Sequence, residues 1–219
     1  MKIFLDTANR ELIKSWIPTG VINGVTTNPS LLSKEDPDVK SVLKDICDIV
    51  KGDVSIEVVE KEPEKVYKQA IQISKLAKNV VVKIPFSREY LPVISQLTKE
   101  GVKINVTLIF SLVQALLVAK LGVKYISPFI GRWDDIDVDG INLIQDLVIM
   151  QENYGFESKI LAASIRNVIH LQKSILIGAD VATIPPTLLD KVFNHPLTLQ
   201  GIDKFDADWK KLGKKNLFD

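Results

Sequence analysis

Residues 80–108 read VVVKIPFSREYLPVISQLTKEGVKINVTL and contain a strand, a helical stretch and a second strand. The first run, Val80 to Pro85, is apolar except for Lys83, which is typical of a parallel strand buried on both faces. The second run, Lys103 to Leu108, has the same character, and the residues between the two runs are amphipathic. This stretch therefore predicts one β–α–β unit of an α/β protein.

The same period continues in both directions along the chain. Each apolar run is followed by a helical stretch, the first of them from about Asn9 to Trp16. The predicted strands are Ile3 to Asp6, Gly24 to Asn28, Val54 to Val59, Val80 to Pro85, Lys103 to Leu108, Tyr125 to Ile130, Ile160 to Ser164 and Val181 to Pro185. An open doubly wound sheet would usually have fewer strands, and an α/β barrel uses ~200 to 250 residues as one domain. The 219 residues therefore predict a single-domain (β/α)8 TIM barrel.

The last residues lie outside this repeat. We expect the barrel core to occupy residues 1–197 and an extra C-terminal helix and tail to occupy residues 198–219. The segment Lys204 to Lys211 places Phe205, Trp209 and Leu212 along one helical face before Gly213, a plausible C-terminal stop. This apolar stripe is expected to pack on the barrel or on another subunit.

Composition excludes several classes of function. Twenty-eight basic and 27 acidic residues give a net charge of +1, so nothing in the overall charge favours nucleic acid or an anionic membrane as a partner. Met1 leads directly into an apolar strand, and no run reaches ~18 uncharged apolar residues, so a cytoplasmic protein is expected. One cysteine and two histidines without ligand spacing predict neither an internal disulfide nor a metal site.

Lys83 is the residue that points most directly to chemistry. Burial of an ammonium group is costly and favours the neutral amine, which is a nucleophile that captures carbonyl substrates as a Schiff base. The alternative is a lysine at a strand end whose side chain extends to water.

Polar residues lie at or near the ends of seven consecutive predicted strands. They are Asp6, Thr26, Asn28, Glu57, Lys83, Asn105, Thr107, Ser127, Ser164 and Arg166, with Phe129 on the same face as Ser127. In barrels the chemistry lies at the C-terminal ends of the strands, so these side chains should meet at one mouth. Singly, each could cap a helix or satisfy backbone groups. Together, the ionisable groups in otherwise apolar strands favour a reactive site.

Arg132 and Arg166 lie at the rims of the sixth and seventh predicted strands. Two guanidinium groups on adjacent loops suit a terminal phosphate, with Ser164 as a third donor. The alternative is that they are surface arginines with Asp134 and Asp135 as salt partners.

Seven short motifs, in chain order, resemble those of the transaldolase family, specifically its short-chain (small-subunit) members. They are FLDTAN (4–9), VTTNPS (25–30), SIEV (55–58), VKIP (82–85), NVTLIF (105–110), SPFIGR (127–132) and ASIRN (163–167). The resemblance covers essentially the whole chain. One departure is Trp133, which follows Arg132 where an aliphatic residue would be expected.

The resemblance implies a role for each site residue. Lys83 would form the Schiff base, and Asp6 would be the acid/base that handles the hydroxyl proton during carbon–carbon cleavage. Glu57 and Thr107 would hold the water that shuttles protons during imine formation. The substrate-binding residues would be Asn28 and Asn105 for the hydroxyl groups, Ser164, Arg132 and Arg166 for the phosphate, and Ser127, Phe129 and Thr26 lining the site.

The reaction implied by the resemblance belongs to the pentose phosphate pathway. A dihydroxyacetone unit would pass from sedoheptulose 7-phosphate to glyceraldehyde 3-phosphate, giving erythrose 4-phosphate and fructose 6-phosphate, with no metal or organic cofactor. The resemblance also implies a homopentamer or a homodecamer.

Two alternatives remain at this point. The related fructose 6-phosphate aldolase typically has Gln in place of Glu57 and Tyr in place of Phe129; a tyrosine hydroxyl can help protonate the enamine and release free dihydroxyacetone. Phe129 and the sequence Asn105-Val106-Thr107 favour the transferase. The second alternative, a non-catalytic phosphosugar-binding barrel, would be expected to have lost Lys83 or Asp6.

Overall fold

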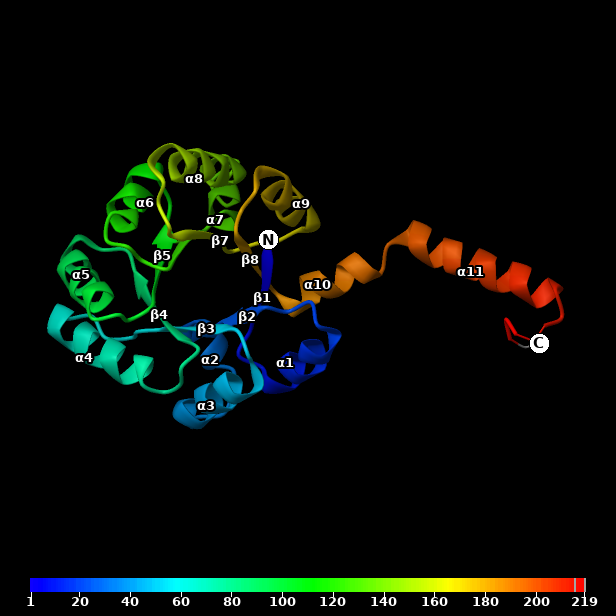
Figure 1. Cartoon of the computed structure of the whole chain (residues 1–219), viewed down its shortest axis with the longest axis horizontal. Helices are drawn as coiled ribbons and strands as arrows, with labels where there is room; N and C mark the ends of the chain where they lie inside the picture. The colour runs from blue at the N-terminus through cyan, green and yellow to red at the C-terminus, as the bar shows by residue number, and fades with distance from the viewer. Residues whose placement is uncertain (215, 219) are drawn as a thin grey trace.

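The computed structural model describes residues 1–214 and 216–218, in which eight parallel strands close into a barrel (Figure 1). The strands are β1 (Lys2–Asp6), β2 (Gly24–Thr26), β3 (Asp53–Glu57), β4 (Val80–Pro85), β5 (Ile104–Ile109), β6 (Tyr125–Pro128), β7 (Lys159–Ala162) and β8 (Val181–Ile184). Each strand pairs with the next, and β1 pairs with β8 to close the ring. The predicted (β/α)8 barrel is confirmed.

Helices follow the strands and surround the barrel (Figure 1). They are α1 (Arg10–Trp16), α2 (Pro29–Leu32), α3 (Val39–Ile49), α4 (Pro63–Ser74), α5 (Leu91–Lys99), α6 (Leu112–Ala119), α7 (Gly131–Asp134), α8 (Ile141–Tyr154), α9 (Val168–Ile177), α10 (Pro186–Phe193) and α11 (Pro196–Lys211), with 3-10 turns η1 (Ile17–Thr19) and η2 (Arg88–Tyr90). None of the helices in the described part of the chain is long and apolar enough to cross a membrane.

The alternation of side chains along β4 explains where the core lies. Val80, Val82 and Ile84 belong to the large apolar cluster between the strands and the helices. Val81 belongs to a smaller cluster that fills the barrel interior together with Phe4 and Tyr125. Because strand residues two apart share a face, Lys83 points to the interior with Val81. The apolar residues therefore form the floor on which the polar residues of the mouth rest.

Five predicted strands end one or two residues earlier in the structure than the sequence suggested, and for three of them (β2, β6 and β7) predicted site residues lie beyond the end. β2 ends at Thr26, and the side chain of Asn28 instead caps α2 by accepting from the Leu31 amide at 2.9 Å. β7 ends at Ala162, because Ser164 has a left-handed φ of 58° that no extended strand adopts. β6 ends at Pro128, and Phe129 keeps only an isolated bridge to Ala163. The site residues beyond these ends therefore lie on loops.

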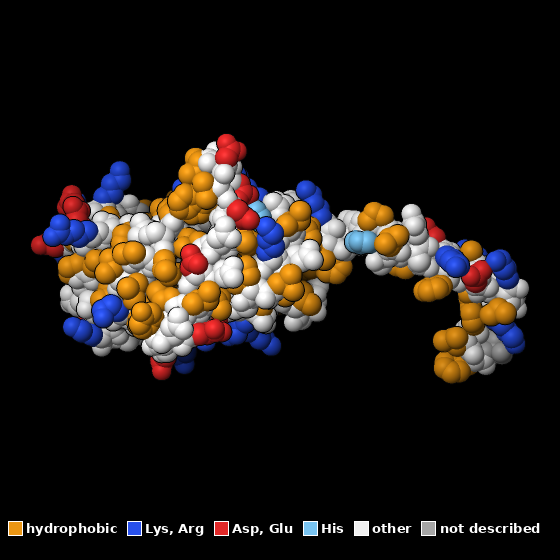
Figure 2. Space-filling view, turned by 90° about the horizontal axis from the view of Figure 1, so that it is seen from above, with side chains coloured by type: hydrophobic (Ala, Val, Ile, Leu, Met, Phe, Trp, Pro, Cys, Tyr) orange, Lys and Arg blue, Asp and Glu red, His pale blue; other side chains and the backbone are white. Residues whose placement is uncertain are grey.

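The C-terminal helix expected within residues 198–219 is present and starts slightly earlier. α11 begins at Pro196, where the His195 side chain caps it by accepting from the Leu197 amide, and it ends at Lys211. The helix extends away from the barrel, with hydrophobic side chains along it, and has no buried residue (Figures 1 and 2). Phe205 is 74 % exposed and Leu212 is 65 % exposed. The apolar stripe therefore does not pack on its own barrel.

Candidate active site

A cavity of about 420 Å³ opens at the C-terminal ends of the strands. Eleven of the twelve predicted site residues line it: Asp6, Thr26, Asn28, Glu57, Lys83, Asn105, Ser127, Phe129, Arg132, Ser164 and Arg166. The parallel barrel explains this convergence, because every strand delivers its last inward residues to the same end. The cavity is of the size that small-molecule ligands occupy.

Lys83 lies on the cavity wall with only 4 % of its surface exposed. Its Nζ lies 3.0 Å from Glu57 Oε2 and donates to the Thr27 carbonyl oxygen at 3.2 Å. Glu57 is its register partner on β3, so the pairing follows directly from the sheet. The ion pair resolves the burial problem that the sequence posed, because a buried charge needs a partner. The alternative in which Lys83 extends to water is wrong.

Asp6 forms a second polar cluster across β1, β2 and β8. Thr26 Oγ1 donates to Asp6 Oδ1 at 2.8 Å and lies 2.6 Å from Thr183 Oγ1. Burial raises the pKa of Asp6 above its usual 3.8, although the Lys83 charge and the Thr26 hydrogen bond act in the opposite direction. A carboxyl group in this state takes up and returns a proton more readily than an exposed aspartate does.

Asn105 is held in one orientation by its neighbours. Ser127 Oγ donates to Asn105 Oδ1 at 2.7 Å, and Asn105 Nδ2 donates to Ser55 Oγ at 3.2 Å. All three residues are buried. Because Ser127 and Ser55 fix both ends of the amide, Asn105 presents a defined donor and acceptor to the cavity.

Thr107 is the predicted site residue that does not line the cavity. Its Oγ1 is buried and has no hydrogen-bond partner among the described residues. The register between β5 and β6 shifts after Val106, and the next residue, Leu108, has a φ of 58° and lines the cavity instead. Buried hydroxyl groups nearly always find a partner, so this atom is suited to a small polar molecule.

Arg132 and Arg166 lie close together because α7 packs on the loop after β7. The Gly131 amide donates to the Ser164 carbonyl oxygen at 3.1 Å. A Cβ atom at Gly131 would lie 2.2 Å from that oxygen and 2.9 Å from Arg166 Nε, so a larger residue would separate the two arginines. Ser164 shares the same corner of the cavity.

The two arginines differ in their present partners. Both terminal nitrogens of Arg166 donate to the carboxylate of Asp135, as the surface alternative predicted. Arg132 is exposed, has no ion pair among the described residues, and lies over the Phe129 ring with 5.3 Å between Cζ and the ring centroid. Asp134, the other predicted salt partner, instead contacts His170. Both arginines line the cavity.

The Phe129 ring lies near both Lys83 and Arg132. Lys83 Nζ is 6.0 Å from the ring centroid, and Arg132 Cζ is 5.3 Å from it. Phe110 packs edge-on against it, with 6.2 Å between the ring centroids, and Trp133 packs edge-on against Phe110 at the same distance. The unexpected tryptophan therefore supports the aromatic wall of the site.

Six residues that line the cavity were not predicted as site residues, and Thr183 is the one whose hydroxyl joins the Asp6 cluster. The six are Pro29, Ser30, Leu108, Leu161, Ala163 and Thr183. The signal was present, because the alternation rule applied to Val181 through Pro185 places Val181 and Thr183 on one face. Polar residues were expected at the ends of the first seven strands alone, and the eighth strand supplies the hydroxyl next to Thr26.

Comparison with known proteins places the chain in a group of relatives. The family model described as transaldolase/fructose-6-phosphate aldolase matches residues 3–216. A protein of Methanococcus maripaludis named "Probable transaldolase" is 53% identical over 210 residues, which are 96% of this chain and 98% of the relative. One of Thermodesulfovibrio yellowstonii with the same name is 50% identical over 214 residues, which are 98% of this chain and 100% of the relative.

A comparison of structures finds the same fold in a more distant protein. Inosine 5' monophosphate dehydrogenase from Legionella pneumophila superposes with a TM-score of 0.60 over 86% of this chain and 58% of that one, at 12% sequence identity. At that identity the likeness concerns the barrel alone.

Proposed function

The chain belongs to the transaldolase/fructose-6-phosphate aldolase family and is a transaldolase, and on that premise we propose that Lys83 carries its reaction as a Schiff base. Its substrates are phosphorylated sugars. A dihydroxyacetone unit passes from sedoheptulose 7-phosphate to glyceraldehyde 3-phosphate, giving erythrose 4-phosphate and fructose 6-phosphate. The observation that carries the assignment of Lys83 is its burial on the cavity wall, paired with Glu57 at 3.0 Å.

In the first step the Lys83 amine adds to the ketone carbonyl, and loss of water gives the protonated imine. The amine must first lose its proton, and Glu57 is the nearest base at 3.0 Å. We assign Thr107 the role of binding the water that leaves during imine formation and returns during hydrolysis, because its buried Oγ1 has no hydrogen-bond partner among the described residues. The protonated imine then serves as the electron sink, so we expect no metal or organic cofactor to be required.

In the second step Asp6 takes a proton from a hydroxyl group of the bound sugar. That hydroxyl group is on the carbon that becomes the aldehyde carbon when the carbon–carbon bond breaks. The carbon–carbon bond breaks, its electron pair moves into the imine, and the aldehyde leaves while an enamine remains on Lys83. The enamine then adds to the acceptor aldehyde, Asp6 returns the proton, and hydrolysis releases the product. The raised pKa of Asp6 suits a group that must hold the proton between cleavage and addition.

The remaining residues bind the sugar. Asn105, fixed by Ser127, is suited to orient a substrate hydroxyl group, and Asn28 lines the same cavity while its carbonyl oxygen caps α2. Arg132, Arg166 and Ser164 form the phosphate subsite at the rim.

We further propose a cytoplasmic enzyme of the pentose phosphate pathway that forms a homopentamer or homodecamer. The exposed apolar stripe of α11 supports self-association, because apolar faces of this kind are usually covered.

Trapping with borohydride tests the proposed function as a whole. Fructose 6-phosphate and borohydride should add a reduced sugar fragment to the protein, and mass mapping should place it on the peptide that contains Lys83. A fragment on another lysine, or none, would contradict the mechanism.

Phe129→Tyr tests the alternative, release of free dihydroxyacetone by an aldolase. The change adds one hydroxyl group to the cavity wall near Lys83 and leaves the lysine and the arginines in place. We expect the variant to gain cleavage of fructose 6-phosphate to dihydroxyacetone and to lose part of its transfer, because the added hydroxyl helps to protonate the enamine. Adding Glu57→Gln should increase the shift.

The assay for this variant measures dihydroxyacetone release and transfer, without and with erythrose 4-phosphate. Phe110→Tyr is the matched control, since it adds the same hydroxyl group to a neighbouring ring that does not line the cavity. A wild-type enzyme that releases dihydroxyacetone as fast as it transfers it would replace the transaldolase assignment by the aldolase.

Arg132→Ala and Arg166→Ala test the phosphate subsite. Each should raise the KM for fructose 6-phosphate and the inhibition constant of inorganic phosphate by about 10- to 30-fold. This is at or just below the lower limit for loss of a buried charged partner, ~2 kcal/mol, because both arginine side chains reach solvent. Borohydride trapping of dihydroxyacetone, which has no phosphate, should be unchanged. Arg10→Ala, which removes an arginine paired with Asp45 outside the cavity, is the control. Equal losses with both sugars would indicate a structural role.

A further inference from the structure

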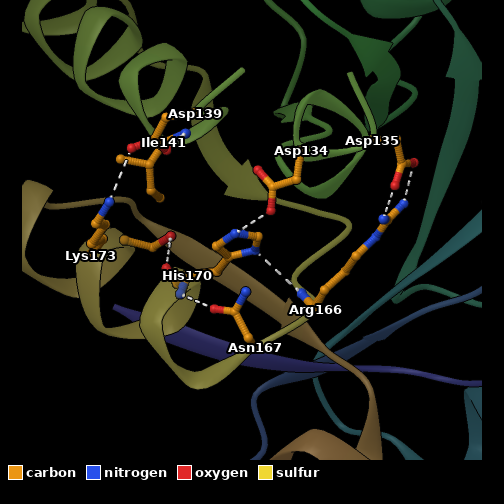
Figure 3. Close-up of polar contacts among 9 residues, drawn as sticks. Asp134, Asp135, Asp139, Ile141, Arg166, Asn167, His170 and Lys173 are labelled. Carbon is orange, nitrogen blue, oxygen red and sulfur yellow. Dashed lines mark hydrogen bonds and ion pairs between the residues drawn. The ribbon is translucent and has the colours of Figure 1, made fainter. Parts of the chain in front are cut away.

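Two segments carry the arginines of the phosphate subsite, and acidic side chains join them (Figure 3). Residues 131–140 include α7 and Arg132, and residues 164–173 include Arg166 and the start of α9. Three aspartates of the first segment each contact a basic residue of the second. The pairs are Asp134–His170, Asp135–Arg166 and Asp139–Lys173.

Burial separates one of these pairs from the other two. The His170 side chain is 9 % exposed, whereas Arg166 is 46 % and Lys173 is 45 % exposed. Exposed ion pairs contribute little because water and salt screen them. A hydrogen bond from a buried donor to a charged acceptor contributes more. The contact between His170 Nε2 and Asp134 Oδ2, at 2.8 Å, is therefore the strongest of the three side-chain pairs.

The other nitrogen of the same ring contacts the second segment. His170 Nδ1 accepts from the backbone N–H of Arg166 across a longer distance of 3.4 Å. The backbone of His170 is itself fixed, because its N–H donates to Asn167 Oδ1 at 2.8 Å at the start of α9. Since Nδ1 must accept, this arrangement uses the imidazole that carries its proton on Nε2 and donates it to Asp134. One ring thus contacts both segments (Figure 3).

We propose that His170 is a positioning residue of the phosphate subsite, which holds Arg132 and Arg166 at a fixed separation. The inference rests on the proposed function, in which these arginines bind the substrate phosphate. His170 does not line the active-site cavity, so it acts through Asp134 and the Arg166 backbone and not on the sugar. Its loss should weaken phosphate binding and leave the chemistry at Lys83 intact.

His170→Leu removes both ring contacts while keeping an apolar side chain in the buried position. We expect the KM for fructose 6-phosphate and the inhibition constant of inorganic phosphate to rise about tenfold, the size of effect that loss of a buried hydrogen bond to a charged group produces. The kcat and the trapping of dihydroxyacetone on Lys83 should stay within about twofold. Asp134→Ala should give the same pattern from an exposed position, so the test does not depend on the folding of the leucine variant.

Two further variants separate positioning from general support. His170→Gln places an amide N–H near the position of Nε2 and should recover most of the lost phosphate affinity through Asp134. Lys173→Ala removes an exposed pair between the same two segments and should change the inhibition constant by less than about twofold.

The proposal fails if His170→Leu and Asp134→Ala leave the inhibition constant of inorganic phosphate unchanged, or if dihydroxyacetone trapping falls as far as phosphate binding does. Failure of the inference and failure of the proposed function give different results. If Arg132→Ala and Arg166→Ala weaken phosphate binding but the His170 and Asp134 variants do not, only the inference is wrong. If none of the four variants weakens phosphate binding, the phosphate subsite itself is wrongly assigned.

Discussion

Replacing Lys83 by alanine is expected to lower the rate of sugar transfer by at least ~10³-fold, because it removes the proposed covalent nucleophile. The borohydride adduct should disappear with it. No second lysine lines the cavity among the described residues, so no other amine can take over the reaction. The measurement is kcat for transfer together with the mass of the protein after trapping with fructose 6-phosphate.

The alanine variant also leaves Glu57 without its partner. Breaking a buried pair by removing one member costs ~3 to 5 kcal/mol, so the loss of activity must be separated from loss of structure. Lys83→Ala combined with Glu57→Gln removes both charges and should fold more stably than the single variant while remaining inactive. Lys103→Ala, a change at an exposed lysine just before β5, is the control and should retain full activity. An undiminished adduct on the alanine variant would disprove the assignment of Lys83.

The fold could be predicted because a single physical rule repeats along the chain. Strands buried on both faces are continuous apolar runs, and each such run is separated from the next by an amphipathic stretch. The same rule identified Lys83, since a charged residue in a run such as Val80 to Pro85 is conspicuous. It also placed Glu57 and Lys83 at the same barrel mouth, and the register of β3 and β4 in the structure then pairs the two residues.

What the rule could not predict is where strands end, because side chains that contact the local backbone decide this. Asn28 leaves the strand to cap α2, and the left-handed φ of Ser164 turns the chain away after β7. Neither event changes the apolar pattern. The start of α11 differs from the expected residue 198 by two positions for a related reason: Pro196 at its first turn and the His195 cap set the start of the helix, and neither changes the apolar pattern.

The phosphate rim was predicted in part. The sequence offered a phosphate subsite or surface salt bridges for the two arginines as alternatives, and the structure contains elements of both. Arg166 contacts Asp135 while lining the cavity, and Arg132 lines it without an ion pair among the described residues. The contact of Asp134 with His170 was not predicted, because it joins residues on two loops whose relative position only the closed barrel fixes.

Asp6→Asn is expected to lower transfer by roughly 10²- to 10⁴-fold, the contribution of a positioned acid/base group. It should differ from the Lys83 variant in one decisive respect, because it keeps the amine. Borohydride trapping with fructose 6-phosphate should still label Lys83, and the bound sugar should remain uncleaved. Loss of the adduct in this variant would show that Asp6 supports imine formation and not bond cleavage.

The pH dependence of kcat, compared between the wild type and Asp6→Asn, gives an independent test. Asp6 acts as a base in the carboxylate form, and burial raises its pKa above 3.8, so the acid limb of the kcat profile should lie above that value in the wild type. The residual activity of Asp6→Asn should lack this limb. A wild-type limb at or below pH 3.8 would argue against Asp6 as the titrating group.

The raised pKa of Asp6 also affects the free energy of unfolding. Ionisation of Asp6 is needed for activity, but it lowers stability. The folded protein holds this proton more tightly than the unfolded chain does, so at neutral pH the ionised carboxylate lowers the free energy of unfolding. That penalty decreases as the pH falls through the raised pKa. Asp6→Asn keeps an oxygen that can accept from Thr26 but removes the charge, so its melting temperature at pH 7 should exceed that of the wild type. The difference in melting temperature between the variant and the wild type should shrink towards acid pH. If the variant is less stable than the wild type at pH 7, the Lys83 charge stabilises the ionised Asp6 more than burial destabilises it.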